Sequence, residues 1–332
     1  MKILILTEGG KKYGFGHITR CLAIYQELKS KFDVRLVVDG DSAAKDFLGN
    51  VNVYISNWHK DTKKVFKLIG KNDAVIIDSY KAGPSFCKEL SGKSQVSLYI
   101  DDNNRLRYPR GVVVNGNIYA KELEYPRTKG MQYLLGTDYV CLRKDFLKIP
   151  SKRINKQIRS IMLTYGGSSN SDFTAKTLRF LSVNYPGIHK LVVVPEGFKD
   201  IAKLECAKDS KTEFMHSPDA KGMIGLMLKA DICICGGGQT INELARIGVP
   251  TVGICFADNQ RLNLKTWQEK GFIKYIGHYK GLDLFDNLKS ALENLSSQKV
   301  RTKMSKIGRK FVDGKGSRRI TEQVLGAYAD KN

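Results

Sequence analysis

Short apolar, β-branched runs alternate with helical segments along most of the chain, and this alternation limits the possible folds more than any other feature of the sequence. Strands that are apolar throughout are buried on both faces, and a helix between two strands allows them to run parallel. The first half is therefore predicted to form a parallel α/β sheet covered by helices on both faces. Its predicted strands are MKILIL, DVRLVV, DAVIID, SQVSLYI and GVVVN.

The alternation restarts after the polar, proline-initiated segment 150–157, which we interpret as a linker. A chain of 332 residues has room for two domains. We therefore expect domains over 1–150 and 151–332, two similar α/β units that face each other across a cleft. The predicted strands of the second unit are RSIMLTYGG, HKLVVVPEG, ADICICGGG and PTVGICF, with helices over 171–183, 240–247 and 259–270 and a basic helix at the end.

The composition is that of a folded protein, 42% hydrophobic and 27% charged. No apolar run approaches the roughly 18 residues that cross a bilayer, and the apolar start is too short for a secretory signal, so we expect a cytoplasmic location. The net charge of +22 is spread over both halves, without a dense basic stripe interleaved with aromatic residues. This distribution argues against nucleic acid as a partner and favours anionic small molecules or weak association with an anionic membrane.

The seven cysteines form no CxxC pair, and the histidines form no HxxxH or HExxH motif. Cys233 and Cys235 alternate with isoleucines inside an apolar run, as thiols of a buried strand would. We therefore interpret the cysteines as reduced core residues and expect no metal site.

Three glycine-rich turns follow predicted strands, at 9–17, 166–168 and 236–240. In open α/β sheets, ligands bind beyond the carboxyl ends of the strands. None of the turns has the Gly-Lys-Ser/Thr of a phosphate-loop ATPase, and none has the GxGxxG motif of a dehydrogenase in a first βαβ unit. These two classes of enzyme are therefore excluded. Glycines allow close backbone approach and a helix N-terminus attracts phosphate, so the third turn is a candidate diphosphate site; a plain tight turn is the alternative.

Two residues beside these turns have side chains suited to chemistry. His17 lies between a glycine turn and a helix start, where the positive end of the helix disfavours imidazolium and leaves a neutral base; a structural histidine is the alternative. Glu243 follows Thr240 by three residues and either completes a capping box or accepts hydrogen bonds from a ribose diol. The other histidines are expected at the surface or in packing roles: His59, His189, His216 and His278.

Six blocks, in this order, carry a resemblance to one family: GFGHITRCL, DSY at 78–80, YIDD at 99–102, LLGTDYVCLRKDF at 134–146, LTYGGSSN at 163–170 and GGGQTINELARIGVPTVGICFADNQ at 236–260. They resemble the UDP-sugar hydrolases of pseudaminic acid biosynthesis, which remove UDP from UDP-2,4-diacetamido-2,4,6-trideoxy-β-L-altropyranose. That family is related to the peptidoglycan N-acetylglucosaminyltransferase. The resemblance implies a GT-B fold of two Rossmann-like domains, a UDP-sugar substrate and no cofactor.

The resemblance also implies roles for individual residues. His17 would be the general base that activates water, Glu243 would hold the ribose hydroxyls, and the backbone near Met215 would hold the uracil base. The other implied UDP-binding residues are Gly166, Gly167, Ser168, Gly238, Gln239 and Thr240. The implied residues on the sugar side are Gly14, Gly16, Arg20, Tyr80, Asp102, Tyr139, Arg143, Asn259 and Gln260.

Some of these assignments leave alternatives. Asp102 is as well suited to capping a loop as to contacting a sugar. Ser79 and Ser169 depart from the family, where histidine and aspartate are common at these positions. A glycosyltransferase of the same architecture, with a membrane or sugar acceptor in place of water, is the main alternative function. A binding module for nucleotide sugars or RNA without catalysis is the other.

Overall fold

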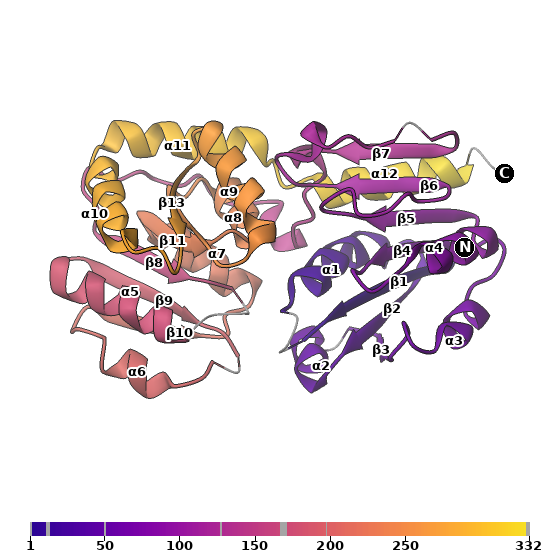
Figure 1. The fold of residues 1–332 in the computed structure, drawn as a ribbon, viewed down its shortest axis with the longest axis horizontal. Coiled ribbons are helices and arrows are strands. Elements are labelled where there is room, and N and C mark those ends of the chain that lie inside the picture. Colours follow the sequence, from indigo (N-terminus) through magenta and orange to yellow (C-terminus); the bar gives the residue numbers. More distant parts are fainter. Residues whose placement is uncertain are drawn as a thin grey trace. The chain divides into compact units, whose positions relative to one another are not determined.

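The computed structural model describes residues 2–10, 14–49, 51–126, 128–166, 171–196 and 198–329 (Figure 1). The chain divides into two compact units. The first unit comprises Met1–Leu147 and Gly314–Asn332, and the second comprises Lys148–Asp313.

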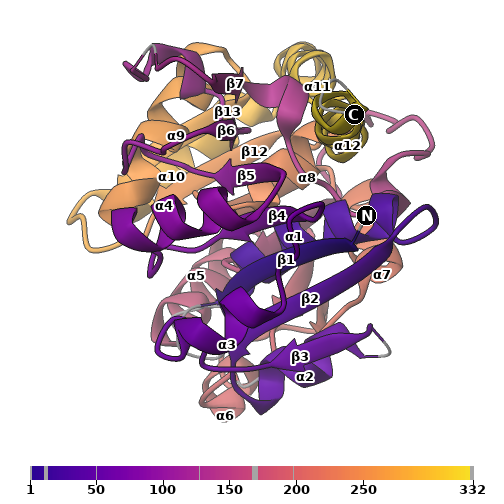
Figure 2. The ribbon, with the colours of Figure 1, turned by 90° about the vertical axis from the view of Figure 1, so that its right-hand side faces the viewer.

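In the described residues, the first unit contains a seven-stranded sheet in the order β3-β2-β1-β4-β5-β6-β7. All neighbouring strands are parallel, and Figure 2 shows β1, β2 and β3 side by side. The five predicted strands are confirmed, whereas β3 and β7 were missed because they are only partly buried. The strands are β1 (Lys2–Gly9), β2 (Asp33–Gly40), β3 (Val53–Ile55), β4 (Ala74–Asp78), β5 (Val96–Ile100), β6 (Gly111–Asn115) and β7 (Met131–Leu135).

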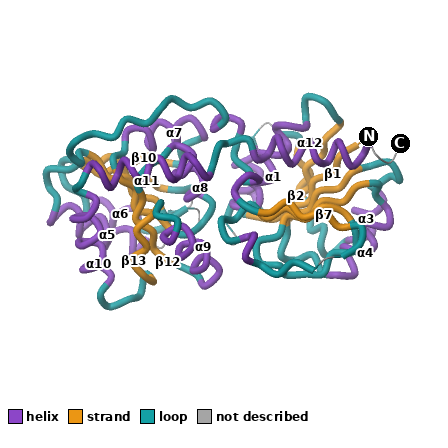
Figure 3. Tube along the Cα trace, turned by 90° about the horizontal axis from the view of Figure 1, so that it is seen from above, coloured by secondary structure: helices purple, strands orange, loops and turns teal. Residues whose placement is uncertain are grey.

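Helices cover both faces of this sheet, as the apolar strands predict (Figure 3). Ile3 and Ile5 of β1 point to one face and Leu4 and Leu6 to the other, the alternation of a β-strand. The helices on the first face are α1 (Gly16–Leu28), α2 (Ser42–Leu48) and α12 (Gly316–Ala329), and those on the second are α3 (Thr62–Lys67) and α4 (Pro84–Lys93).

Helix α12 returns to the first unit although it ends the chain, as its yellow ribbon shows in Figure 1. Ile320 and Val324 are buried in the core with α1. Gly316 lies so close to the backbone of Val140 that a Cβ on it would be 2.2 Å from the carbonyl oxygen. The expected second domain, 151–332, therefore extends beyond the second compact unit, which ends at Asp313. The sequence could not show this, because a helical pattern does not tell which sheet the helix covers.

The expected linker packs onto the second unit. Lys152 is buried and its Nζ donates to the carbonyl oxygens of Met227 (3.0 Å), Leu228 (3.0 Å) and Ala230 (2.5 Å). Burial lowers the pKa of Lys152 to about 8. The polar sequence of 150–157 therefore reflects hydrogen bonding to the second unit.

The second unit contains, in its described residues, a six-stranded sheet in the order β10-β9-β8-β11-β12-β13, again all parallel. The predicted strands and the predicted helices over 171–183, 240–247 and 259–270 are confirmed, whereas two strands, β10 and β13, and four helices of the described residues were not predicted. The strands are β8 (Ser160–Thr164), β9 (His189–Val194), β10 (Thr212–His216), β11 (Ile232–Gly236), β12 (Thr251–Cys255) and β13 (Ile273–His278). The helices are α5 (Ser171–Asn184), α6 (Ile201–Glu205), α7 (Ala220–Lys229), α8 (Thr240–Ile247), α9 (Asp258–Glu269), α10 (Leu284–Leu295) and α11 (Gln298–Phe311).

The thiols follow the sequence-based interpretation with one exception. Six of the seven cysteines are buried, but Cys206, which follows α6, is exposed. In the part of the chain that the structure describes, none of the helices has both the length and the apolar character needed to span a bilayer.

Replacing Ile320 by Ala should lower the free energy of unfolding of the first unit by about 2–5 kcal/mol, because a fully buried side chain is lost and a cavity remains. Native-state hydrogen exchange should show reduced protection in α1 and β5, with β8 and β11 unchanged. Ile201→Ala is the control, since Ile201 is 44% exposed. An equal loss of protection in both units would contradict the assignment of α12 to the first unit.

Candidate active site

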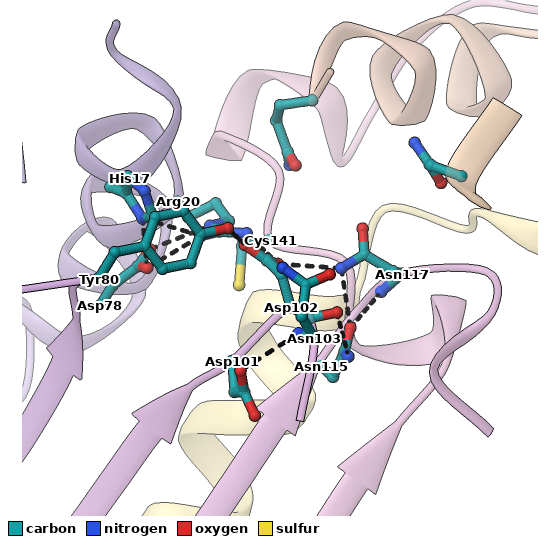
Figure 4. Close-up of polar contacts among 12 residues, drawn as sticks. His17, Arg20, Asp78, Tyr80, Asp101, Asp102, Asn103, Asn115, Asn117 and Cys141 are labelled. Carbon is teal, nitrogen blue, oxygen red and sulfur yellow. Dashed lines mark hydrogen bonds and ion pairs between the residues drawn. The ribbon is translucent and has the colours of Figure 1, made fainter. Parts of the chain in front are cut away.

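The carboxyl ends of β1, β4, β5 and β6 lie next to one another at one edge of the first sheet. Polar side chains from each strand end, or from the segment after it, meet there (Figure 4). We call this group the strand-end cluster: His17, Arg20, Asp78, Tyr80, Asp102 and Asn117. Ligands of open α/β sheets bind at such an edge, so the cluster is the candidate active site of the first unit.

A glycine turn brings His17 to this edge. The backbones of Gly10 and Gly14 exchange two hydrogen bonds of 3.0 and 2.8 Å, which close the turn after β1. Gly14 has a φ of +76°, which favours glycine. Helix α1 begins two residues later at the exposed Gly16, and His17 is its second residue. Gly14 therefore shapes the loop before His17 through its backbone, whereas a Cβ on Gly16 would meet no neighbour within 4 Å. A contact of either glycine with a sugar stays a prediction.

Asp78 at the end of β4 holds two basic side chains of α1. Its carboxylate is 1% exposed, and its Oδ1 lies 2.6 Å from Nδ1 of His17. Arg20 donates twice to the same carboxylate, from Nε to Oδ2 at 3.0 Å and from Nη2 to Oδ1 at 2.9 Å. His17 and Arg20 reach one carboxylate because residues three apart lie on the same face of a helix.

The pKa of His17 is raised above its ordinary value of 6.5. Burial and, less strongly, Arg20 lower this pKa, but the charge and hydrogen bond of Asp78 raise it more. The expectation of an imidazole kept neutral by the helix end is therefore wrong in direction, because a carboxylate in direct contact outweighs a partial charge. Nδ1 of His17 also lies 3.0 Å from Nη2 of Arg20, which can only donate, so we assign the Nδ1 proton from the shorter contact with Asp78. In that tautomer Nδ1–H donates to Asp78 and Nε2 is the atom that can take a proton; within the described ranges Nε2 has no hydrogen-bond partner.

Asp102, after β5, is the second carboxylate of the cluster. It accepts hydrogen bonds from Arg20 Nη1 (2.6 Å), Tyr80 Oη (2.7 Å) and Asn117 Nδ2 (2.9 Å). Burial opposes its charge, but Arg20 holds the pKa of Asp102 well below its usual range. The neighbouring Asp101 is the loop-capping residue, since it accepts from the backbone N–H groups of Asn103 and Arg105. The alternative that Asp102 caps the loop is therefore not what the structure shows.

Tyr80 lies beside the imidazole. Its ring is edge-on to His17 with the ring centres 4.8 Å apart, and the residue is 41% exposed. Burial of the hydroxyl and the charge of Asp102 raise the pKa of Tyr80, so the phenol stays protonated. The exposed part of this ring is therefore a surface that a ligand near His17 would meet.

Sequence reasoning assigned no role to Asp78 or Asn117. A signal for Asp78 was present, because it is a carboxylate that ends the wholly buried run of β4. The strand lies beside β1, with Thr7 opposite Asp78. No comparable pattern marks Asn117, which follows β6 by two residues.

Two expected sugar-side residues have packing contacts in the segment after β7. Tyr139 ends the short 3₁₀ helix Thr137–Tyr139 and packs against the hydrophobic core. The guanidinium of Arg143 lies over the ring of Phe146, 5.7 Å from its centre. These contacts join the segment to the core and leave its part in binding a prediction.

In the second unit, the expected UDP-binding glycines lie at neighbouring strand ends. Gly166, with a φ of +76°, follows β8, and Gly238 follows the adjacent β11. Gly167 and Ser168 lie outside the described residues. Met215 is half-buried in β10, an edge strand that is separated from β11 by β9 and β8.

The start of α8 does not match the capping-box interpretation of Glu243. Gln239 is the N-cap of this helix and makes no side-chain capping hydrogen bond. Thr240 is therefore not at the position that a capping box requires. Glu243 itself is buried, 5% exposed. Its use for ribose stays a prediction.

Gln260 has a structural contact that the sequence did not suggest. Its Oε1 accepts from the backbone N–H groups of Gly237 (3.2 Å) and Phe256 (3.0 Å), and so connects the turns after β11 and β12. A Cβ on Gly237 would lie 2.7 Å from Cβ of Gln260. The neighbouring Asn259 is exposed at the start of α9. In the described ranges, no three His, Cys, Asp or Glu side chains lie together as metal ligands would.

The chain has distant relatives among characterised and uncharacterised proteins, and no family model matches it. It is 23% identical over 337 residues to the spore coat polysaccharide biosynthesis protein SpsG of Bacillus subtilis, with 99% of each chain covered. It is 23% identical over 302 residues to the pseudaminic acid cytidylyltransferase and UDP-2,4-diacetamido-2,4,6-trideoxy-beta-L-altropyranose hydrolase of Helicobacter pylori. It is 26% identical over 279 residues to the uncharacterized protein MJ1062 of Methanocaldococcus jannaschii. The last two matches cover 90% and 79% of this chain but only 52% and 57% of those relatives.

Solved structures share the fold over nearly the whole chain. MurG of Acinetobacter baumannii has a TM-score of 0.65 at 16% identity, covering 98% of this chain and 100% of that one. The UDP-GlcNAc 2-epimerase of Neisseria meningitidis bound to UDP-GlcNAc has a TM-score of 0.63 at 12% identity, and the match covers 98% of this chain and 100% of that one. The calicheamicin glycosyltransferase CalG4 has a TM-score of 0.64 at 15% identity, and the match covers 99% of this chain and 98% of that one. The predicted GT-B fold, two Rossmann-like units with parallel sheets, is thereby confirmed.

The pKa of His17 should lie above 6.5 and should fall in Asp78→Asn, because the carboxylate that stabilises imidazolium is removed while Arg20 stays. NMR titration of the imidazole resonances measures this, with His17→Asn assigning the signal. The raised folded pKa also means that protonation stabilises the fold below pH 6.5, an effect lost as pH rises through the folded value. Asp33→Asn, which changes a 59% exposed side chain, is the control. A pKa that stays the same or rises in Asp78→Asn would refute the assigned cause.

Proposed function

We propose that the chain is a nucleotide-sugar hydrolase of polysaccharide biosynthesis that releases UDP from UDP-2,4-diacetamido-2,4,6-trideoxy-β-L-altropyranose, for pseudaminic acid. The contact of His17 with Asp78, with Nε2 left for a proton, is the observation that carries the proposal. The hydrolase named in the Helicobacter pylori relative supports the substrate.

The reaction needs a base more than an acid. A water oxygen bonds to the anomeric carbon as the bond from that carbon to the diphosphate oxygen breaks, and the electron pair leaves with UDP. Nε2 of His17 takes the water proton, while Asp78 holds Nδ1–H and stabilises the imidazolium. The diphosphate spreads its own negative charge, so a strong general acid of the kind that ordinary glycosidases use is unnecessary. Attack opposite the leaving group inverts the anomeric centre.

The second unit would hold the nucleotide. Backbone N–H groups at Gly238, Gln239 and Thr240 lie at the start of α8, where the helix end favours a diphosphate. Glu243 would accept the ribose hydroxyls, and Met215 would lie near the base. Stabilisation of the leaving diphosphate in this way asks for no cofactor.

A glycosyltransferase is the second candidate function. The likeness of the fold to CalG4 favours it, and the net charge of +22 suits docking on an anionic membrane that carries an acceptor. In that reaction an acceptor hydroxyl takes the place of water at the same carbon. The two functions therefore differ in whether UDP release depends on an acceptor.

UDP should be released from the diacetamido sugar nucleotide in the absence of any acceptor, because water is the nucleophile. A panel of UDP-sugars assayed for UDP release tests this, with UDP-N-acetylglucosamine and UDP-glucose as reference substrates. Release from none of them without an acceptor would reject the hydrolase and leave the transferase.

His17→Asn should lower the rate of UDP release by roughly 10²–10⁴-fold, since the general base is lost. Calorimetric titration should give unchanged UDP affinity, because the second unit is untouched. His189→Asn, at the start of β9 in the second unit, is the control. Near-normal turnover in His17→Asn would refute the role of His17.

A further inference from the structure

The side-chain amide of Asn117 has one orientation in the strand-end cluster. Its Nδ2 donates to Oδ1 of Asp102 and to Oδ1 of Asn115, each at 2.9 Å. Both partners are acceptors, so turning the amide over would bring its oxygen against two other oxygens. The backbone N–H of Asn117 donates to the same Asn115 oxygen at 3.0 Å. The hydrogen-bond network therefore fixes where the amide nitrogen and the amide oxygen of Asn117 lie.

Asn115, which supports this amide, is itself held in place. It is the last residue of β6 and is buried. Its Nδ2 donates to the backbone oxygen of Asp102 at 3.0 Å and to Oη of Tyr125 at 3.1 Å, so its Oδ1 is the atom that faces Asn117. A side chain that is ordered before a ligand binds loses little conformational entropy on binding. Asn117 is therefore preorganised at the edge of the sheet.

The oxygen of this amide is an acceptor that the cluster itself does not use. Each carboxylate oxygen of Asp78 and Asp102 accepts at least one hydrogen bond from a side chain of the cluster. Oδ1 of Asn117, in contrast, has no hydrogen-bond partner in the part of the chain that the structure describes. Figure 4 shows this oxygen pointing away from Asp102 and Asn115. It is therefore placed to accept a hydrogen bond from a ligand.

A continuous set of contacts through Arg20 places Asn117 near His17. Nη1 of Arg20 lies 2.6 Å from the Asp102 oxygen that Asn117 also contacts, and Nη2 lies 3.0 Å from Nδ1 of His17. Together with the width of one planar guanidinium, these contacts keep Nδ2 of Asn117 within about 11 Å of Nδ1 of His17. A hexose ring with one substituent, and a water between the ring and the imidazole, can span such a distance.

We propose that Oδ1 of Asn117 accepts a hydrogen bond from the N–H of an acetamido group of the sugar. The nitrogen of an acetamido group only donates, so it needs an acceptor once the sugar leaves water. A hydroxyl at the same carbon can turn its hydrogen to another partner, whereas the N–H is fixed in the plane of its amide. Asn117 thereby favours acetamido sugars over plain hexoses. The inference rests on the proposed function, because it takes the sugar to lie beside His17.

Asn117→Ala, added to His17→Asn to prevent turnover, should weaken binding of the diacetamido sugar nucleotide by about tenfold, because an N–H loses its acceptor. Calorimetric titration should show an unchanged affinity for UDP, which has no sugar, and a smaller change for UDP-glucose, whose sugar carries hydroxyls only. Asn52→Ala is the matched control and should change none of these affinities. Asn52 is exposed and precedes β3, so it lies at the amino end of a strand, away from the cluster.

The titration of His17 distinguishes contact with the sugar from support of the cluster. In Asn117→Ala alone the pKa of His17 should not change, because Asp102 keeps its charge and its contact with Arg20. A shifted pKa, equal weakening for UDP or UDP-glucose, or no weakening would overturn the inference. If a thermal melt shows that Asn117→Ala does not fold, Asn117→Ser decides, since its hydroxyl can donate to Asp102 but it lacks the amide oxygen. UDP release from wild-type protein without an acceptor judges the proposed function separately.

Discussion

The carboxylate of Asp78 is the group on which the candidate site depends. It is almost wholly buried, and the charge is tolerated because Arg20 donates to it twice and His17 once. Breaking such a buried pair typically costs about 3–5 kcal/mol, since an uncompensated charge stays behind. The same contacts fix the start of α1 against the end of β4. Stability at this edge and orientation of the imidazole therefore come from one set of interactions.

The cluster is close to electrical balance although the chain carries a net charge of +22. Asp78 and Asp102 face Arg20, so the three charges sum to one negative charge until His17 is protonated. That residual charge explains why the pKa of His17 is raised despite burial. It also stabilises the imidazolium that forms when a base takes a proton. In the proposed reaction, the surplus basic side chains would act at longer range, on the approach of the anionic substrate.

Much of the fold could be predicted from the sequence, because strands buried on both faces are continuous apolar runs. The four missed strands, β3, β7, β10 and β13, are each partly exposed, so their sequences lack that signal. His17 was found through its glycine turn, a local pattern. Its partner Asp78 lies 61 residues away, and a contact of that kind depends on strand order. The pKa direction was missed for the same reason, since it depends on that partner.

The two units differ in the chemistry of their strand ends. Carboxylates converge at the edge of the first sheet, whereas the turns of the second are glycines held by the neutral amides of Gln260 and Asn263. Cleavage of a glycosyl diphosphate separates charge, with positive character growing on the sugar and negative charge on the leaving group. A carboxylate-rich edge suits the positive character on the sugar, and backbone N–H groups at a helix start suit the negative charge on the leaving group. In the proposed reaction, the first unit therefore acts on the sugar and the second on UDP, although both have the same doubly wound architecture.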